Sequence, residues 1–324
     1  MTALRWPFAP ALCLAFLSPF LAEVGSTNIP FFSFFSPPVF LALAAFYGLP
    51  VLLIRDAKIA WGLSTTGVFL LGVAYGILNE GILAKTLTQV HECPLPTFAP
   101  YPRTFGFNLS WATFILPWHA FFSVVFPIAI TDRLFPGHER RRYLSSRLTK
   151  FVSLMVFGLF LLWFAPPEKP EGNIPLDVPH FLALMAAISA FVLVGIRCRT
   201  EASIGRMRAP FLLGASMLLY WIGEVVLTQH SAPAPGIYAY GILGALIFVR
   251  SIRGRQDGRA DLVRFACGAS LTFFSFSALM SVASGRRVLE TAGMGLVFFF
   301  SYAFAASRFA RDERVEAGER PTQN

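Results

Sequence analysis

The sequence predicts an all-α, polytopic integral membrane protein with about ten transmembrane helices. Of its 324 residues, 55% are hydrophobic and only 14% are charged, whereas about a quarter of the residues in soluble domains are charged. The apolar residues form runs close to the roughly 20 residues that a bilayer-spanning helix needs. The Lys and Arg residues gather in the connections between these runs, which is typical of a membrane protein.

Ten apolar runs are candidate helices, at about 8–22, 39–54, 60–83, 107–130, 151–165, 180–196, 211–228, 237–249, 262–283 and 291–307. The first run follows Arg5 and could be read as a signal peptide, but Phe20 and Ala22 make a poor cleavage site. We therefore expect a short helix that is retained. The proline-containing stretches 23–38 and 85–106 are expected to form an interfacial segment and a surface loop.

The basic residues predict the orientation of the chain. With the N-terminus inside, 22 of the 27 Lys and Arg residues lie on the inner side, as the positive-inside rule requires. The five that would lie outside are Lys85, Arg103, Lys169, Arg286 and Arg287. Both termini are therefore expected to be cytoplasmic. The net charge of +9 reflects this topology, so we expect no nucleic-acid partner.

These runs and loops divide the chain into four parts. The expected parts are a four-helix transmembrane part at 1–135 that carries the polar motifs, a basic cytoplasmic loop at 136–150, a six-helix transmembrane part at 151–307 and a disordered cytoplasmic tail at 308–324. Besides the lipid bilayer, the expected partners are anionic lipid head groups, which Arg140, Arg141 and Arg142 in the basic loop would contact.

The run 60–83 contains an ionisable residue, Glu80, near its outer end. A charged group in hydrocarbon costs at least about 2.5 kcal/mol, so it needs a partner or a task. Gly72, Gly76 and Glu80 are spaced by four and lie on one helix face, where small residues let a neighbouring helix come close. We expect Glu80 to face protein, where it either clasps a neighbouring helix or belongs to a functional site with Asn79.

The run 107–130 carries a polar stripe. Asn108, Trp111, His119 and Ser123 follow the three-and-four spacing of one helix face, and His119 lies near the middle of the membrane. A histidine there can be a packing residue, a proton relay or a metal ligand, but no second histidine stands at metal-binding spacing. Two prolines in the same run, Pro117 and Pro127, are expected to bend the helix and free backbone carbonyls.

The run 211–228 contains a second intramembrane carboxylate. Ser216, Tyr220, Glu224 and Thr228 recur at four, and Glu224 has the same predicted depth as Glu80. By the predicted topology Glu23 and Asn108 also lie in the outer part of the membrane. We therefore hypothesise that these groups meet in one polar cavity that opens to the external side.

The four cysteines do not indicate a metal or cofactor site. Cys13, Cys93, Cys198 and Cys267 are scattered, without a C-x-x-C pair or metal-ligand spacing. We expect them to be structural, and no motif in the chain indicates a cofactor.

Several short motifs carry a family resemblance. They are Glu23 with Gly25-Ser26-Thr27 and Pro30, Tyr47-Gly48 with Arg55-Asp56, Ala74-Tyr75-Gly76-Ile77 with Asn79-Glu80-Gly81, Gly106-x-Asn108-x-x-Trp111, and His119-Ala120-x-x-Ser123 with Pro127-Ile128. In these motifs, roughly between Glu23 and Pro136, the chain resembles an uncharacterised family of prokaryotic multi-pass membrane proteins, although Asn79 departs from the family's paired acids. The resemblance implies the plasma membrane of a bacterium or archaeon and brings no established activity.

Three functional hypotheses follow. The leading one is that an outer-side polar cavity moves or binds a small solute, a lipid or a proton through Glu80, His119, Asn108 and Glu224. The second is an intramembrane hydrolase or transferase that acts on lipid-borne substrates, with Glu80 as general base and His119 as its partner. In support of this second hypothesis, the chain is weakly similar to the intramembrane proteases that process prenylated proteins, but it does not reproduce the spacing of their motifs. The third is a structural or partner-binding subunit.

Overall fold

The computed structural model describes residues 8–25, 28–89, 93, 95–135, 137–164, 176–199, 207–253 and 261–270. Every regular element in these ranges is a helix, as predicted. In chain order the elements are α1 (Ala9–Pro19), η1 (Phe20–Val24), α2 (Phe31–Phe34), α3 (Pro37–Leu43), η2 (Ala44–Gly48), α4 (Leu49–Trp61), α5 (Thr65–Ile77), η3 (Leu78–Leu83), α6 (Leu109–Trp118), η4 (His119–Val125), α7 (Phe126–Leu134), α8 (Ser146–Phe164), α9 (Val178–Arg197), α10 (Pro210–Gln229) and α11 (Ala234–Ile252). The four η elements are π-helical, and residues 261–270 are also helical.

Six continuous helices among the described residues are long and apolar enough to cross a membrane. They are Pro37–Trp61, Thr65–Leu83, Leu109–Leu134, Val178–Arg197, Pro210–Gln229 and Ala234–Ile252, and Ala9–Val24 is a shorter apolar helix. The candidate run 291–307, most of the run 262–283 and the tail 308–324 lie outside the described residues. The polytopic helical fold is therefore confirmed, whereas the count of about ten is not.

The second apolar run is longer than predicted. We expected it to end at residue 54, before a charged loop, but α4 continues through Arg55 to Trp61. The helix continues because the charged side chain of Arg55 is buried and bonds to Asp132 on α7 and to the carbonyls of His138 and Arg141 in the loop that follows α7. Gly62 then ends the helix at φ 61°, and Ser64 caps α5 by accepting a hydrogen bond from the amide of Gly67. As a consequence α5 begins at Thr65, five residues later than expected.

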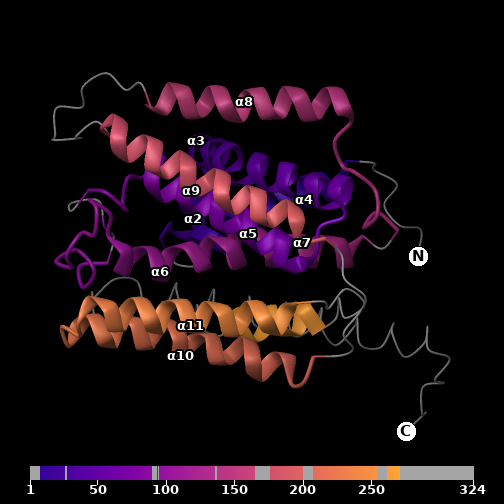
Figure 1. Ribbon diagram of the computed structural model, residues 1–324. Coiled ribbons are helices and arrows are strands. Elements are labelled where there is room, and N and C mark those ends of the chain that lie inside the picture. The colour runs from indigo at the N-terminus through magenta and orange to yellow at the C-terminus, as the bar shows by residue number, and fades with distance from the viewer. Residues whose placement is uncertain are drawn as a thin grey trace, which may run out of the picture.

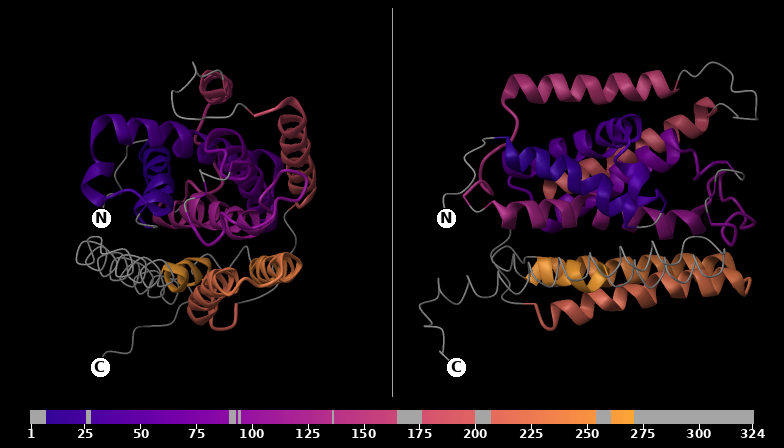
Figure 2. Two further views of the ribbon diagram at one scale, coloured as in Figure 1. Left: turned by 90° about the vertical axis from the view of Figure 1, so that its left-hand side faces the viewer. Right: turned by 180° about the vertical axis from the view of Figure 1, so that it is seen from behind.

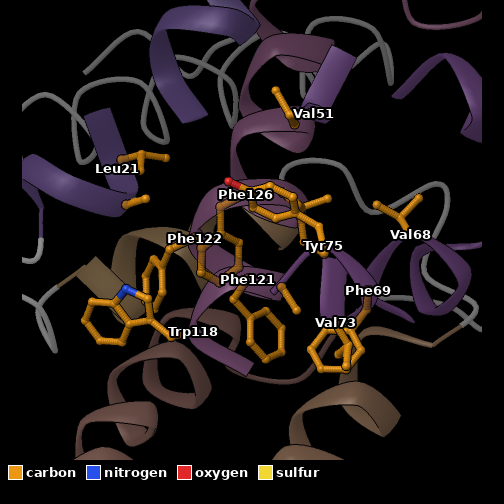
Figure 3. Packing of buried hydrophobic residues seen from close by; sticks show 14 of the residues in the cluster. Leu21, Val51, Val68, Phe69, Val73, Tyr75, Trp118, Phe121, Phe122 and Phe126 are labelled. Carbon is orange, nitrogen blue, oxygen red and sulfur yellow. The ribbon is translucent and has the colours of Figure 1, made fainter. Parts of the chain in front are cut away.

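Helix α5 and the long helix α6–η4–α7 form the centre of the protein. Figures 1 and 2 show α9 running beside α5, the α10–α11 pair on the far side of α6, and α8 at the edge of the assembly. Aromatic side chains fill the interior: the rings of Phe122 and Phe126 lie 5.1 Å apart, and those of Trp118 and Phe122 lie 4.9 Å apart (Figure 3). The polar residues described below are held in this apolar interior.

The outer helices present apolar side chains at the surface. Exposed large hydrophobic residues on α9, α10 and α11 include Leu182, Leu193, Val194, Leu212, Leu219, Val226, Ile242, Leu246 and Ile247. A protein in water rarely exposes a continuous apolar surface of this kind. Contact with lipid tails would account for this apolar surface, as expected for an integral membrane protein.

A buried ion cluster closes the end of the bundle where α4 and α7 finish. The guanidinium of Arg55, which is fully buried, donates to one oxygen of Asp132 from Nε at 3.3 Å and from Nη2 at 3.2 Å. Lys58 reaches the other oxygen of Asp132 at 2.7 Å. The aromatic ring of Tyr143 lies 3.6 Å from the guanidinium carbon. Burial, together with the charge of Asp132, raises the pKa of the Tyr143 hydroxyl well above its ordinary value.

The basic loop docks onto this cluster. Asp56 accepts backbone hydrogen bonds from Tyr143 at 2.8 Å and from Leu144 at 3.1 Å, and it pairs with the guanidinium of Arg142 at 3.4 Å. Arg140, Arg141 and Arg142 are nevertheless exposed side chains. Carboxylates on α4 and α7 thus hold the loop in a defined conformation against the helix ends.

Candidate functional site

Six polar residues of the first four helical runs lie on π-helical segments. Glu23 is in η1, Tyr47 is in η2, Asn79 and Glu80 are in η3, and His119 and Ser123 are in η4. A π-helical turn inserts an extra residue into a helix, and such turns occur frequently at functional sites. Each of the first four helices therefore departs from α-helical geometry where it presents a candidate site residue.

Prolines free backbone carbonyls that other helices use. Pro50, Pro117 and Pro127 lack the N–H that would bond the carbonyl four residues earlier. Those three carbonyls each accept a hydroxyl from another helix: Phe46 from Tyr75 at 2.9 Å, Thr113 from Tyr220 at 2.8 Å and Ser123 from Ser18 at 2.6 Å. The expectation that Pro117 and Pro127 free backbone carbonyls is thus confirmed, and Pro50 frees the carbonyl of Phe46 in the same way.

Glu80 and His119 form a buried pair between η3 and η4. Glu80 Oε1 lies 2.7 Å from His119 Nε2, and the two residues are 8% and 3% exposed. The other ring nitrogen, His119 Nδ1, lies 3.1 Å from the hydroxyl of Ser123, one turn along η4. The close approach depends on the glycine face of α5, because a Cβ at Gly76 would lie 3.2 Å from the Cβ of His119. A carboxylate, an imidazole and a hydroxyl are therefore connected in series.

The second carboxyl oxygen of Glu80 accepts a hydrogen bond from the hydroxyl of Thr86. Thr86 Oγ1 bonds to Glu80 Oε2, and it also lies 2.8 Å from the indole nitrogen of Trp111. Because an indole N–H can only donate, Thr86 must accept from Trp111 and direct its own hydrogen toward Glu80. Oε2 is thereby an acceptor, so a proton carried by this carboxyl group belongs on Oε1, in the contact with His119.

Tyr75 joins the pair to the neighbouring helix. Its hydroxyl donates to the freed carbonyl of Phe46 and accepts from the amide of Asn79 at 3.3 Å. The ring of Tyr75 meets the imidazole of His119 edge-on, with 5.7 Å between the ring centres. Asn79 thus acts on the site through Tyr75 and not through Glu80.

Glu23 lies beside the pair but bonds to a different partner. The Tyr47 hydroxyl donates to Glu23 Oε1, and the amide of Asn28 donates to Glu23 Oε2. The Tyr47 ring stacks against the ring of His119 at 6.0 Å between centres. The imidazole is therefore enclosed by two tyrosine rings, one of which connects it to a second carboxyl group.

Asn108 caps a helix next to the site. Its side-chain oxygen accepts from the amide of Trp111 at 3.0 Å, and its nitrogen donates to the carbonyl of Phe98 at 2.9 Å. The residue fixes the start of α6 and the loop that precedes it. Its influence on Glu80 passes through Trp111 and Thr86.

Tyr220 and Glu224 lie against another face of α6. The Tyr220 hydroxyl bonds to the carbonyls of Thr113 and Gly241, and the Glu224 carboxyl group lies beside the same two residues. None of the contacts of Glu224 in the described structure joins it to Glu80. The structure therefore brings Glu80, His119 and Ser123 together with Glu23 and Asn79 close by, and it keeps Glu224 in a separate cluster.

Four residues of this site were not among the sequence-predicted candidates. Tyr47 and Tyr75 stand inside the motifs that carry the family resemblance, so a signal for them existed. Asn28 and Thr86 follow the helices that they serve, and no helical spacing points to them. Their contacts with Glu23 and Glu80 depend on how the connecting backbone folds back onto the helix, which the sequence pattern does not show.

The arrangement is suited to holding and exchanging a proton. Among the residues that the structure describes, no group of three His, Cys, Asp or Glu side chains could hold a metal ion. A carboxyl group and an imidazole in direct contact can share one proton without burying a net charge.

Comparison with known sequences and structures leads to a family. The sequence model of an uncharacterised membrane protein family matches residues 12–308, which is most of the chain. No curated protein and no solved structure matches it.

Proposed function

The chain belongs to an uncharacterised membrane protein family, and for it we propose that the first four helical runs bind a proton at the Glu80–His119 pair and release it as it crosses the membrane. The observation that carries this proposal is the contact of 2.7 Å between Glu80 Oε1 and His119 Nε2 in the apolar interior. Both residues are almost completely buried. Because the pair is shielded from water, we expect it to exchange a proton only when the surrounding helices admit water.

The balance of charge links proton exchange at this pair to a change in the surrounding helices. With one proton the pair is neutral as a whole, either as carboxylic acid and imidazole or as carboxylate and imidazolium. Removing that proton leaves a net negative charge in a medium where ion solvation is poor, which is costly. Proton release is therefore linked to an opening of the site. Ser123 on the far side of the imidazole extends the chain of exchangeable protons by one group.

The position along the helix supports an outer-side site. Glu80 is fifteen residues beyond the start of α5, which is about 22 Å of helix, in a hydrocarbon core about 30 Å thick. The Arg55 cluster lies at the opposite end, where α4 and α7 finish. With both termini in the cytoplasm, as the basic residues predict, the pair faces the external half of the membrane, and the family resemblance implies that this is the plasma membrane of a bacterium or archaeon.

Proton flux in vesicles tests the proposal. The full chain would be reconstituted into liposomes that enclose a pH-sensitive dye, and a membrane potential would be imposed to draw protons inward. We expect Glu80→Gln to reduce the protein-dependent flux at least tenfold. Asp177→Asn makes the same chemical change at an exposed helix cap and should leave the flux unchanged. Equal flux in the wild type and Glu80→Gln would refute proton exchange at this pair.

A second candidate function has a specific observation in its favour. The series of Ser123, His119 and Glu80 has the members of a nucleophile, base and carboxylate relay, which suits a hydrolase or transferase acting on lipid-borne substrates. The Ser123 side chain is fully buried, however, so a substrate could reach it only after a rearrangement. Covalent labelling by a fluorophosphonate probe in the wild type, and its loss in Ser123→Ala, would favour this enzyme.

We also propose that the exposed arginines of the basic loop, Arg140, Arg141 and Arg142, bind anionic lipid head groups. The loop is held in a fixed conformation by Asp56, and Arg142 also bonds to the hydroxyl of Thr149 at 3.0 Å. Mass spectrometry of the protein released from mixed-lipid nanodiscs should show fewer retained anionic lipids after both Arg140 and Arg141 are changed to Ala. Unchanged retention would contradict the assignment.

A further inference from the structure

A second buried carboxyl group lies outside the Glu80 site. Glu224 on α10 is 0% exposed, and neither of its side-chain oxygens has a hydrogen-bond partner among the described residues. None of the described basic side chains pairs with it. Since an isolated charge in a protein interior costs several kcal/mol, this environment requires an explanation.

The donors around Glu224 are already committed to backbone carbonyls. The Thr113 hydroxyl on α6 donates to Ser110 at 2.9 Å, and the Tyr220 hydroxyl one turn back on α10 bonds to Thr113 and Gly241. Tyr240 on α11 donates to Leu219 at 2.9 Å. A carboxylate at this place would compete with those carbonyls for its hydrogen bonds, whereas an ionised carboxyl group in an apolar interior needs donors of its own.

A carboxylic acid fits the same surroundings. The Thr113 hydroxyl lies 2.9 Å from the carbonyl of Ser110, and a hydroxyl that donates to a carbonyl keeps lone pairs that can accept a hydrogen bond from a neighbouring acid. We infer that Glu224 is a second proton-binding site, and that it holds its proton as long as α11 is packed against α6. This site is separate from the Glu80–His119 pair and does not depend on the proposed function.

Close packing of α11 keeps water away from the carboxyl group. A Cβ built at Gly241 would overlap both Glu224 Oε1 and the side chain of Thr113, so only glycine lets the helix come this close. The hydroxyl of Tyr220, which bonds to carbonyls on both α6 and α11, ties the two helices together at the same level. Separation of α11 from α6 would admit water and permit the proton to leave.

Infrared spectroscopy of the full chain in lipid nanodiscs tests the inference. At a pH of about 7, far above the roughly 4.3 of an unperturbed glutamate, we expect the carbonyl band of a protonated carboxylic acid that is lost in Glu224→Gln. Absence of such a band from the difference between wild type and variant, in buffers with and without sodium, would refute the inference. A band that appears only when sodium is removed would instead identify a sodium site and would also refute it.

Steric substitutions on α11 provide a matched pair of variants. Gly241→Ala should push α11 away from α6, admit water and remove the Glu224 band at neutral pH. Gly236→Ala on the same helix introduces its methyl group where no atom lies within 4 Å and should leave the band in place. If Gly241→Ala folds and keeps the full band, packing of α11 does not control the proton. A loss of the band in Gly236→Ala would likewise contradict the assignment.

Discussion

Replacing Gly72 by alanine should separate α5 from η4 and weaken the protein. A Cβ at this position would lie 2.8 Å from the Cα of Ala120, 3.1 Å from its Cβ and 3.2 Å from its carbonyl oxygen. Two of these three atoms belong to the backbone, so no side-chain rotation can relieve the contact. Overpacking of this kind typically costs about 1–3 kcal/mol.

An opposing effect must be subtracted from this value. Alanine stabilises a helix by roughly 0.5–1 kcal/mol relative to glycine, so the net loss for Gly72→Ala should be about 0–2.5 kcal/mol, and the loss relative to an unhindered Gly→Ala change about 1–3 kcal/mol. Gly158 in α8 provides the control, because a Cβ there meets no atom within 4 Å. Gly158→Ala should therefore retain only the helix-stabilising effect.

The assay is reversible unfolding of the two variants in mixed micelles as denaturing detergent is increased. The difference between their unfolding free energies isolates the contact with Ala120. Because Ala120 directly follows His119, the proton flux described above should also fall in Gly72→Ala. If Gly72→Ala unfolds at the same free energy as Gly158→Ala, the close approach of α5 and η4 would be refuted.

Three further predictions concern other parts of the molecule. Arg55→Ala should lower the unfolding free energy by about 3–5 kcal/mol in the same assay, because it removes the fully buried cation of the pair with Asp132. Arg140→Ala at an exposed site should change it by less than about 0.5 kcal/mol. Tyr75→Phe should lower the unfolding free energy by about 1–3 kcal/mol, because the carbonyl of Phe46 loses its hydroxyl donor; an unchanged value would contradict this. Burial raises the pKa of Cys93 to about 11, so alkylation followed by mass spectrometry should be slow at pH values near 8 and accelerate up to about pH 11; rapid labelling near pH 8 would contradict burial of the thiol.

Much of the helical framework could be predicted from the sequence. Composition and the spacing of apolar runs predict helices close to those observed, since both depend on local properties of the chain. The end of α4 was predicted wrongly because Arg55 and Asp56 look like loop residues until Asp132 and the loop at Tyr143 are brought to them. The burial of Arg55 and Asp56 depends on tertiary contacts, and these cannot be predicted from composition.

The site was predictable in part for a related reason. Helical spacing identifies Glu80 and His119 as polar positions on apolar helices, and the glycine spacing turns Glu80 toward protein. Spacing cannot identify which faces meet, so it does not join Glu80 to His119 or separate both from Glu224. The π-helical segments also change the facing of residues along a helix, and a period of 3.6 does not describe them.

The freed carbonyls change what a proline contributes to this fold. In an isolated helix, replacing proline by alanine restores a hydrogen bond and is expected to strengthen the helix. Here restoration of the N–H at position 50, 117 or 127 would offer the carbonyls of Phe46, Thr113 and Ser123 an internal donor, in competition with the hydroxyls of Tyr75, Tyr220 and Ser18. Each helix would become straighter and more self-contained, and the bundle would lose its cross-links. Each of the three prolines thus removes one hydrogen bond within its own helix and makes a carbonyl available for a hydrogen bond from another helix. The packing of the bundle is stabilised by these bonds between helices.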